Sequence, residues 1–448
     1  MMAGGTFVGG ARSATDTLPD IEPQTAFGRV ISWAGIPPIM IWGFIGTLLF
    51  MIGDGVESGY LSPYLVSLGF QEHDVAGLFT IYGLTAAVSA WASGALSDMW
   101  GSRKVMLVGL AIWILFQIGF LGFALPSKSW TLITLFYGLR GFGYPLFAFG
   151  FLVWVVNTAP VQKLGSAVGW FWFCFTAGLP TLGTTIAGVL LPVIGGYATL
   201  WVALSFVVFG GALALLGMNR VPRVETGNKG AIKTLFMSLA IGWQRPKVGI
   251  GCIVRAINTS AEFGFLVFMP LYFTHTLGFT MGQWLAVLQA IFISNIFFNL
   301  FLGIISDKLS WRYTVLIMGG IGSTLSTMAL YFAPTMLGPD HLFIVMIAGA
   351  FYGMTLAGYV PLSALMPYLA PENKAAAMSL LNLGAGASVW IGPAIVYIFE
   401  PSFGVFGVMV VYSIIYFISA VLTYFLKLDP EVEAHLHSTR ASAKGFSH

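Results

Sequence analysis

Five ionisable residues stand inside long apolar stretches of this sequence: Asp54, Glu57, Arg140, Arg255 and Glu262. A charge in hydrocarbon costs about 2.5–3.5 kcal/mol on insertion scales, so such a group faces water, a counter-ion or a bound solute rather than lipid. Asp54 and Glu57 are three residues apart and therefore share one face of a helix. The rest of the chain must build a polar interior around these side chains.

Composition indicates that this interior lies within a membrane. Of the 448 residues, 57% are hydrophobic and only 8% are charged, whereas soluble domains carry about 25% charged residues. Cys174 and Cys252 both fall in apolar runs and give neither a disulfide framework nor a metal spacing. None of the six histidines stands deep in an apolar run. We therefore expect a polytopic membrane protein with no metal and no other cofactor.

Twelve stretches are long and apolar enough to cross a bilayer, which requires about 20 residues for a helix. The fold class that we predict is therefore an all-α membrane protein with twelve transmembrane helices. The predicted spans are 38–66, 73–96, 103–125, 130–157, 164–190, 196–218, 248–274, 282–305, 312–334, 341–368, 374–398 and 404–427.

The distribution of basic residues predicts the orientation. Seventeen of the twenty Lys and Arg residues fall on one side when the N-terminus is placed in the cytoplasm, and only Lys128 falls on the other. Basic residues gather in cytoplasmic loops, so we expect a cell (plasma or inner) membrane protein with both termini cytoplasmic. The predicted divisions are a tail (1–28), a six-helix bundle (29–218), a cytoplasmic linker (219–247), a second bundle (248–427) and a tail (428–448).

The sequence also repeats itself. The segment Gly94-Ala-Leu-Ser-Asp98 recurs 209 residues later as Gly303-Ile-Ile-Ser-Asp307, and Arg103 recurs at the same offset as Arg312. The segment Leu-Gly-Phe at 68–70 recurs at 277–279, again 209 residues later. Such repeats indicate two pseudo-symmetric halves of six spans with the same topology, related by an axis along the membrane normal.

The segments GALSDMWGSRK and GIISDKLSWRY resemble the signature loop of the major facilitator superfamily, and each stands between the second and third spans of its half. The resemblance implies two bundles that rock about one central site. It also implies that Asp98, Arg103, Asp307 and Arg312 form gating latches, in which an aspartate accepts from helix N-terminal amides and pairs with the arginine. The alternative is a plain surface ion pair, which contributes little stability.

Other segments resemble the polyol permease family, whose members include ribitol and arabinitol permeases and a 2-oxoglutarate permease. The similar segments are MIGDGVESGYLSPYL, IYGLTAAVSAWASG, FYGLRGFGYPLFAFGFLVWV, SAVGWFW, RAIN, AGYVPL and AAAMSLLNLGAG. The standard first signature loop makes the chain look closer to the 2-oxoglutarate branch.

Two interpretations of the intramembrane charges remain open. In one, opposite charges neutralise each other and only hold helices together. In the other, a carboxylate takes up a proton together with a cargo, and an arginine binds the cargo or resets the carboxylate. We favour the second, with Asp54 as the first candidate for the proton and Glu262 as the second. Glu57 is a third candidate, and a gate or a structural ion pair is the alternative role for it.

Cargo recognition requires polar side chains on the faces that line the cavity, and the resemblance to the major facilitator superfamily implies that spans one, four, seven and ten supply these faces. Amides both donate and accept, which suits hydroxyl groups, and aromatic faces can stack on sugars. The candidate cargo-binding residues are Arg140, Arg255, Asn258, Tyr144, Gln289, Asn295, Tyr359 and Asn382. Of Trp170 and Trp172, which are two residues apart, at most one faces the cavity. Ordinary packing is the alternative for each aromatic residue.

These observations predict a proton-coupled importer of a small polar solute such as a polyol. The alternatives are an organic anion such as 2-oxoglutarate, a carboxylate siderophore, and a membrane sensor that moves no solute. No nucleophile–base pair and no G-x-x-x-x-G-K loop is present, which argues against an enzyme and against ATP-driven pumping. The expected partners are the solute, protons and the lipid bilayer, with no nucleic acid, and the chain is expected to be a monomer.

Overall fold

The structure is a computed structural model that describes residues 31, 35–58, 60–70, 72–219, 221 and 231–432. The expected N-terminal tail, part of the linker (222–230) and the C-terminal tail from residue 433 onward lie outside the described residues. Within the described residues the regular elements are all helical. Helices are what an apolar chain in a bilayer requires, because lipid offers no hydrogen-bond partner to the backbone.

The first half of the chain forms one helical bundle. Its α-helices are α2 (Ile41–Ser58), α3 (Leu61–Ser67), α4 (Glu72–Trp100), α5 (Ser102–Gly119), α6 (Leu125–Ser127), α7 (Trp130–Arg140), α8 (Gly143–Thr158), α9 (Leu164–Thr176) and α10 (Thr184–Gly217). Short 3-10 or π-helical turns join several of them, namely η1 (Pro38–Met40), η2 (Phe120–Ala124), η3 (Val161–Lys163) and η4 (Ala177–Gly183).

The second half forms a similar bundle after the linker helix α11 (Ala231–Gln244). Its α-helices are α12 (Pro246–Leu271), α13 (Met281–Lys308), α14 (Trp311–Thr314), α15 (Ser323–Leu337), α16 (Leu342–Leu356), α17 (Leu362–Leu369) and α18 (Lys374–Tyr424). The intervening turns are η5 (Tyr272–Thr276), η6 (Val315–Gly322), η7 (Pro339–His341), η8 (Ala357–Tyr359) and η9 (Pro371–Asn373).

The helices account for the twelve predicted spans. Ten stretches of the described residues are long and apolar enough to cross a membrane. One of them, Val161–Gly217, contains two helices that meet at a kink at Gly195. Helix α12 supplies the remaining span, and the charged residues Arg255 and Glu262 in its interior lower its hydropathy. The prediction of a twelve-helix membrane protein is confirmed.

Backbone geometry repeats at the offset found in the sequence. Gly69 and Gly278 both have positive φ, at 103° and 76°, and so do Gly195 and Gly404, at 77° and 60°. The members of each pair are 209 residues apart. Positive φ is a conformation that only glycine adopts without strain, so the same two turns are built by glycine at equivalent places in the two halves. The predicted internal repeat therefore extends from sequence to backbone geometry.

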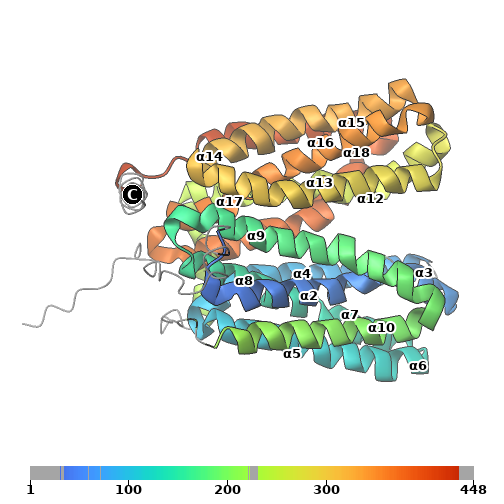
Figure 1. The fold of residues 1–448 in the computed structure, drawn as a ribbon, viewed down its shortest axis with the longest axis horizontal. Helices are drawn as coiled ribbons and strands as arrows, with labels where there is room; N and C mark the ends of the chain where they lie inside the picture. Colours follow the sequence, from blue (N-terminus) through green and yellow to red (C-terminus); the bar gives the residue numbers. More distant parts are fainter. Residues whose placement is uncertain are drawn as a thin grey trace, which may run out of the picture.

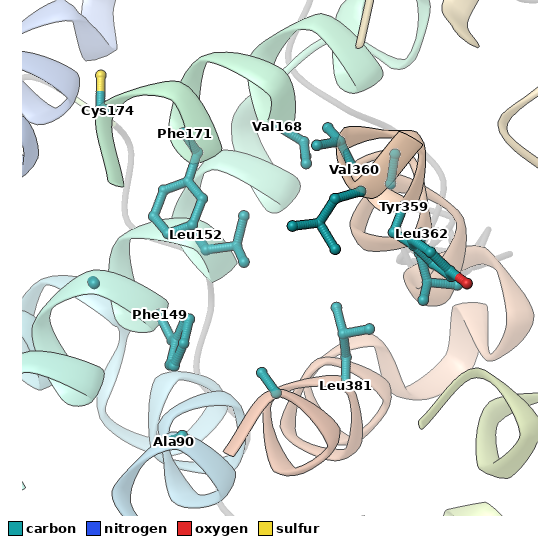
Figure 2. Packing of buried hydrophobic residues seen from close by; sticks show 14 of the residues in the cluster. Ala90, Phe149, Leu152, Val168, Phe171, Cys174, Tyr359, Val360, Leu362 and Leu381 are labelled. Carbon is teal, nitrogen blue, oxygen red and sulfur yellow. The ribbon is translucent and has the colours of Figure 1, made fainter. Parts of the chain in front are cut away.

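Both bundles lie side by side with their helices roughly parallel (Figure 1). We use the term linker end for the end of the molecule where α14 and α17 lie, on the left in Figure 1. Arg312 of α14 bonds to Tyr424 at this end, and Arg245 bonds to Glu372, which follows α17. Apolar side chains from both halves belong to one buried cluster. Figure 2 shows Leu152 and Val168 of the first bundle facing Val360 and Leu381 of the second. This apolar contact joins the two bundles.

Candidate functional site

A buried ion pair occupies the core of the first bundle. Arg140, the last residue of α7, donates from Nη1 to Glu57 Oε2 at 2.6 Å and from Nη2 to Glu57 Oε1. Gln117 on α5 joins the two, because it accepts from Arg140 Nη1 at 2.6 Å and donates to Glu57 Oε2 at 3.4 Å. The side chains of Arg140 and Glu57 are 1% and 2% exposed. Glu57 is therefore engaged by a cation, as the structural alternative for it required.

Aromatic rings enclose this pair. The guanidinium carbon of Arg140 lies 4.4 Å from the ring centre of Tyr137, 4.8 Å from Trp113 and 5.3 Å from Tyr82. Aromatic faces attract cations, and the attraction grows when water is excluded. The Nε of Arg140 is buried and has no hydrogen-bond partner. Arg140 is thus neutralised and confined, and its side chain forms part of the bundle's interior.

Asp54 stands one helical turn before Glu57 in α2 but has different partners. It accepts a hydrogen bond from Trp113 Nε1 at 2.7 Å and forms no ion pair within 4.0 Å among the described residues. Its side chain is buried. Of the two carboxylates in α2, Asp54 is therefore the one whose proton can be gained or lost without breaking an ion pair.

The second bundle carries an arginine that has no carboxylate. Arg255 on α12 is 6% exposed, and in the described part of the chain no Asp or Glu lies within 4.0 Å of its guanidinium. Its one hydrogen bond there is long, at 3.5 Å from Nη1 to Thr259 Oγ1. Thr259 in turn is 2.7 Å from Ser388 Oγ on α18. Arg255 thus keeps most of its donors available.

Arg255 faces the opposite bundle. Its guanidinium carbon lies 5.0 Å from the ring centre of Trp172, which belongs to α9. The indole Nε1 of Trp172 donates to Ser363 Oγ on α17 at 3.3 Å, so Trp172 contacts the second bundle twice. Sequence reasoning allowed one of Trp170 and Trp172 to face the centre, and Trp172 is the residue that meets the second bundle's arginine.

Glu262 follows Arg255 by two helical turns on α12, and it is half-buried with no ion pair within 4.0 Å in the described ranges. Asn258 lies between them and is buried, and its Oδ1 has no hydrogen-bond partner. Its backbone carbonyl accepts from the hydroxyl of Tyr416 at 2.9 Å. Helix α12 therefore offers a cation, an unsatisfied amide oxygen and a carboxylate along about two turns.

The other predicted cargo-binding residues are divided between packing positions and accessible ones. Asn295 donates to the Gly353 carbonyl at 3.1 Å, Tyr359 bonds to Ser419 at 2.5 Å, and both are buried inside the second bundle. Asn382 donates to Ser93 Oγ of the first bundle at 2.8 Å. Tyr144 is half-buried, and Gln289 is exposed on α13. The first three have their amides or hydroxyls occupied by the protein itself.

The residues predicted to form latches lie at the linker end. Asp307, near the end of α13, accepts from the backbone N–H of Gly165 and Ser166, each at 2.8 Å, and from Ser166 Oγ at 2.7 Å. It therefore caps the first turn of α9 in the opposite bundle, where helix N–H groups favour an anion. Arg312 does not pair with Asp307 and instead donates to the carbonyl of Tyr424 at 2.9 Å.

Asp98 and Arg103, the first-half counterparts of Asp307 and Arg312, have different partners. Arg103 donates to the Leu215 carbonyl at 3.1 Å and to Asn219 Oδ1, which tie α5 to the end of α10. Asp98 lies half-buried near the end of α4. The backbone N–H of Ala95, one turn earlier, donates to Ser379 Oγ of the second bundle at 2.6 Å. The α4–α18 contact thus joins the bundles at a second place at the linker end.

Trp113 was missed by the sequence reasoning. It bonds to Asp54 and stacks on Arg140, so it touches both charges of the first bundle. A signal was available, because Trp113 precedes Gln117 by four residues and therefore shares a face of α5 with it.

Sequence and structure comparisons place the chain among transporters. The sequence profile of the Major Facilitator Superfamily matches residues 43–362 and 251–447. An alpha-ketoglutarate permease of Bacillus subtilis is 44% identical over 91% of this chain and 93% of its own length. A D-arabinitol transporter of Klebsiella pneumoniae is 36% identical over 93% of this chain and 98% of its own length. A ribitol transporter of the same species is 37% identical, over 93% and 97%.

Solved structures share the fold. A proton–xylose symporter superposes with a TM-score of 0.67 at 16% identity, and the alignment covers 91% of this chain and all of that one. An Escherichia coli fucose–proton symporter superposes with a TM-score of 0.71 at 10% identity, covering 88% of this chain and all of that one.

Proposed function

Because the chain belongs to the major facilitator superfamily and is a multi-pass secondary transporter, we propose that it moves a small dicarboxylate of the 2-oxoglutarate class together with protons. The observation that carries this proposal is Arg255. It is a nearly buried guanidinium with no carboxylate partner among the described residues, and it stands where the two bundles meet. A buried unpaired cation is costly, so a cargo carboxylate is the group that suits it.

Stacking prepares Arg255 for this role. The face of the guanidinium is covered by Trp172, whose ring centre is 5.0 Å away. Its edges carry the N–H donors, and a planar guanidinium can offer two of them in parallel to one carboxylate. Thr259 and Ser388, which are 2.7 Å apart beside Arg255, add hydroxyl groups for the remaining oxygens of the cargo.

Protons enter the proposal through Asp54 and Glu262. The Glu57–Arg140 pair is neutral, so the net charge of the interior depends on Asp54, Glu262 and Arg255. When both of these carboxylates are protonated, the remaining charge is that of Arg255, which attracts an anion. When both are ionised, the net charge is negative and repels it. Proton uptake and anion binding then favour each other, which is the thermodynamic requirement for symport.

A polyol is the second candidate cargo. The buried Oδ1 of Asn258 lacks a hydrogen-bond donor, and an unsatisfied buried acceptor is a costly feature that a hydroxyl of the cargo would relieve. Two relatives that are 36% and 37% identical carry the names of a D-arabinitol and a ribitol transporter. In this alternative, Asn258 replaces Arg255 as the residue that decides affinity.

The test is uptake of radiolabelled 2-oxoglutarate, D-arabinitol and ribitol into proteoliposomes, with and without an inward proton gradient. We expect gradient-stimulated uptake of 2-oxoglutarate that Arg255→Gln abolishes and Asn258→Ala reduces only in part. If the gradient instead stimulates polyol uptake, and if that uptake persists in Arg255→Gln but is lost in Asn258→Ala, the cargo is a polyol and not a dicarboxylate. Uptake at the same rate with and without the proton gradient would show that transport is not coupled to protons.

Three further features belong to the same proposal. We infer that the linker end faces the cytoplasm, because Lys and Arg concentrate in its loops. The protein acts as a carrier without enzymatic activity, in keeping with relatives that are named as transporters and permeases. It works as a monomer, since each chain carries both halves of the proposed site.

A further inference from the structure

Two groups of basic residues at the linker end differ in their partners. In the first group, Arg245 Nε lies 2.8 Å from Glu372 and Lys247 Nζ lies 2.7 Å from Asp429. The hydrogen bond from Lys247 also lowers the pKa of the Asp429 carboxyl below its usual value. These two basic side chains are balanced by carboxylates of the protein.

The basic residues of the second group have no carboxylate partner among the described residues. Arg312, Lys427 and Lys308 form no ion pair within 4.0 Å in the part of the chain that the structure describes. Arg312 and Lys427 are instead arranged around two tyrosines, with the Arg312 guanidinium carbon 4.5 Å from the ring centre of Tyr313 and 6.0 Å from that of Tyr424. Lys427 Nζ lies 4.9 Å from the ring centre of Tyr424. We refer to Arg312, Tyr313, Tyr424 and Lys427 as the Arg312 patch.

Arg312 is held in place. Its Nη1 donates to the carbonyl of Tyr424 at 2.9 Å, which joins the start of α14 to the end of α18. One guanidinium edge is thus fixed, and the two rings define the plane of the group. The patch is therefore a basic surface site fixed between the start of α14 and the end of α18, and not a pair of unconstrained side chains.

The surroundings place the patch at the membrane–water boundary. It lies where the spans Trp311–Leu337 and Ile398–Tyr424 reach the linker end. Leu309 and Phe425 flank it with 74% and 55% of their surfaces exposed, and both tyrosines are half exposed. Exposed apolar residues beside tyrosines and basic residues are typical of the interfacial region, where acyl chains meet headgroups.

We propose that the Arg312 patch binds the headgroup of an anionic phospholipid. The phosphodiester supplies the negative charge that the protein does not place there, the tyrosine hydroxyls can bond to its oxygens, and Leu309 and Phe425 contact the acyl chains. Basic pockets between transmembrane helices on the cytoplasmic side suit such headgroups. This site is separate from the proposed cargo site and does not depend on the cargo's identity.

The patch is connected to the latch between the bundles. Trp311, the neighbour of Arg312, donates from Nε1 to Asp307 Oδ1 at 2.9 Å. The same Asp307 oxygen accepts from the N–H of Gly165 at the start of α9. A lipid that fixes α14 through Arg312 therefore also holds Trp311 and Asp307 in the arrangement that closes the linker end. We expect the lipid to favour the state in which this end is closed.

The experiment compares two double variants with equal charge loss at the same end. Arg312→Gln with Lys427→Gln removes the two unpaired cations of the Arg312 patch, and Arg245→Gln with Lys247→Gln removes the two paired ones. The full-length protein in neutral detergent is titrated with phosphatidylglycerol, phosphatidylcholine or inorganic phosphate. Bound lipid is counted by native mass spectrometry, and the midpoint of thermal unfolding is recorded. A charge-retaining variant, Arg312→Lys with Lys427→Arg, shows whether the patch tolerates substitution at all.

We expect phosphatidylglycerol to bind and stabilise the wild type, the paired-cation variant and the charge-retaining variant. Each basic residue near an anionic headgroup contributes roughly a fivefold gain in affinity, so the patch variant is expected to bind on the order of 25-fold more weakly. If the paired-cation variant loses as much affinity for phosphatidylglycerol as the patch variant, the lipid responds to overall charge and the Arg312 patch is not a specific binding site. Equal protection by inorganic phosphate would replace the lipid by a free anion.

Discussion

The pair formed by Glu57 and Arg140 yields the sharpest prediction about stability. Both side chains are almost completely buried, and three charge-assisted hydrogen bonds connect them with each other and with Gln117. Removing one partner of a buried pair costs about 3–5 kcal/mol, because the other charge is left without compensation. In Arg140→Gln, Glu57 loses both guanidinium hydrogen bonds and keeps no cationic partner among the described residues, and in Glu57→Gln the cation keeps its rings and one amide oxygen.

The expected shift in melting temperature follows from this free energy. A change of 1 kcal/mol moves the midpoint by about 2–4 °C for a unit of 150–250 residues, so each single variant is expected to melt on the order of 6–20 °C lower. The double variant Glu57→Gln with Arg140→Gln holds no uncompensated charge. It is therefore expected to be more stable than the sum of the single changes indicates, with a coupling free energy of about 2 kcal/mol or more.

The assay can use residues that the protein already contains. Cys174 is buried and Cys252 is half-buried, and both lie in membrane-spanning helices. A thiol-reactive fluorescent dye therefore reports unfolding as the two thiols become exposed. The control is Glu372→Gln, which breaks the ion pair with Arg245, whose partners are about half exposed. An exposed pair contributes about 0–1 kcal/mol, so the control should melt within about 4 °C of the wild type.

Two results would refute the reasoning. If Glu57→Gln and Glu372→Gln lower the midpoint equally, burial does not set the energetics of the Arg140 pair. If the double variant loses as much as both single variants together, the two side chains do not act as a pair.

Three further predictions concern transport and the two ends of the molecule. Asp54→Asn is expected to abolish proton-driven accumulation and to spare counterflow exchange, measured in proteoliposomes, and full accumulation by this variant would remove Asp54 from the mechanism. Trp172→Leu is expected to raise the KM for cargo about tenfold with a smaller change in maximal rate, because a cation–π contact contributes about 0.5–2 kcal/mol. Trp172→Phe, which keeps an aromatic face for Arg255, should restore most of the affinity, and equal KM values for the two variants would contradict the stacking argument. Asp307→Asn is expected to open the linker end, seen as longer distances between spin labels on Lys104 and Lys308, and an unchanged distance distribution would show that the cap on α9 does not hold the bundles together.

Much of the fold followed from the sequence because its causes are local. A membrane span can be recognised from its length and apolarity, and the 209-residue repeat of the sequence predicted two similar halves. The backbone then showed the same offset between the positive-φ glycines Gly195 and Gly404. The positions of the buried charges could also be predicted, because a charged residue inside a long apolar stretch is rare and easily identified. What the sequence did not specify was the pairing. Nothing in the spacing of residues distinguishes Asp54 from Glu57 as the partner of Arg140.

That choice is made by packing between helices. Glu57 meets Arg140 because α4, α5 and α7 bring Gln117 and three aromatic rings around the guanidinium, while Trp113 on α5 donates its hydrogen bond to Asp54. The partner of Arg312 at the linker end is likewise decided by packing between helices. Its position in the signature loop predicted a latch with Asp307, but the end of α18 offers it the carbonyl and ring of Tyr424. Contacts between helices far apart in the chain decide such alternatives.

The aromatic residues give the two charge clusters a physical connection. From Arg255 the contacts run through Trp172 to Phe175 at 5.4 Å, and from Phe175 to Tyr144 at 6.5 Å. Tyr144 stacks on Tyr82 at 6.3 Å, and Tyr82 lies against Arg140. Rings packed in series transmit a displacement because a dense interior cannot absorb it as empty volume. If the proposed function holds, we expect a cargo that moves Arg255 against Trp172 to displace the surroundings of Arg140 and Asp54, and we expect protonation of Asp54 to act back on the cargo through the same contacts.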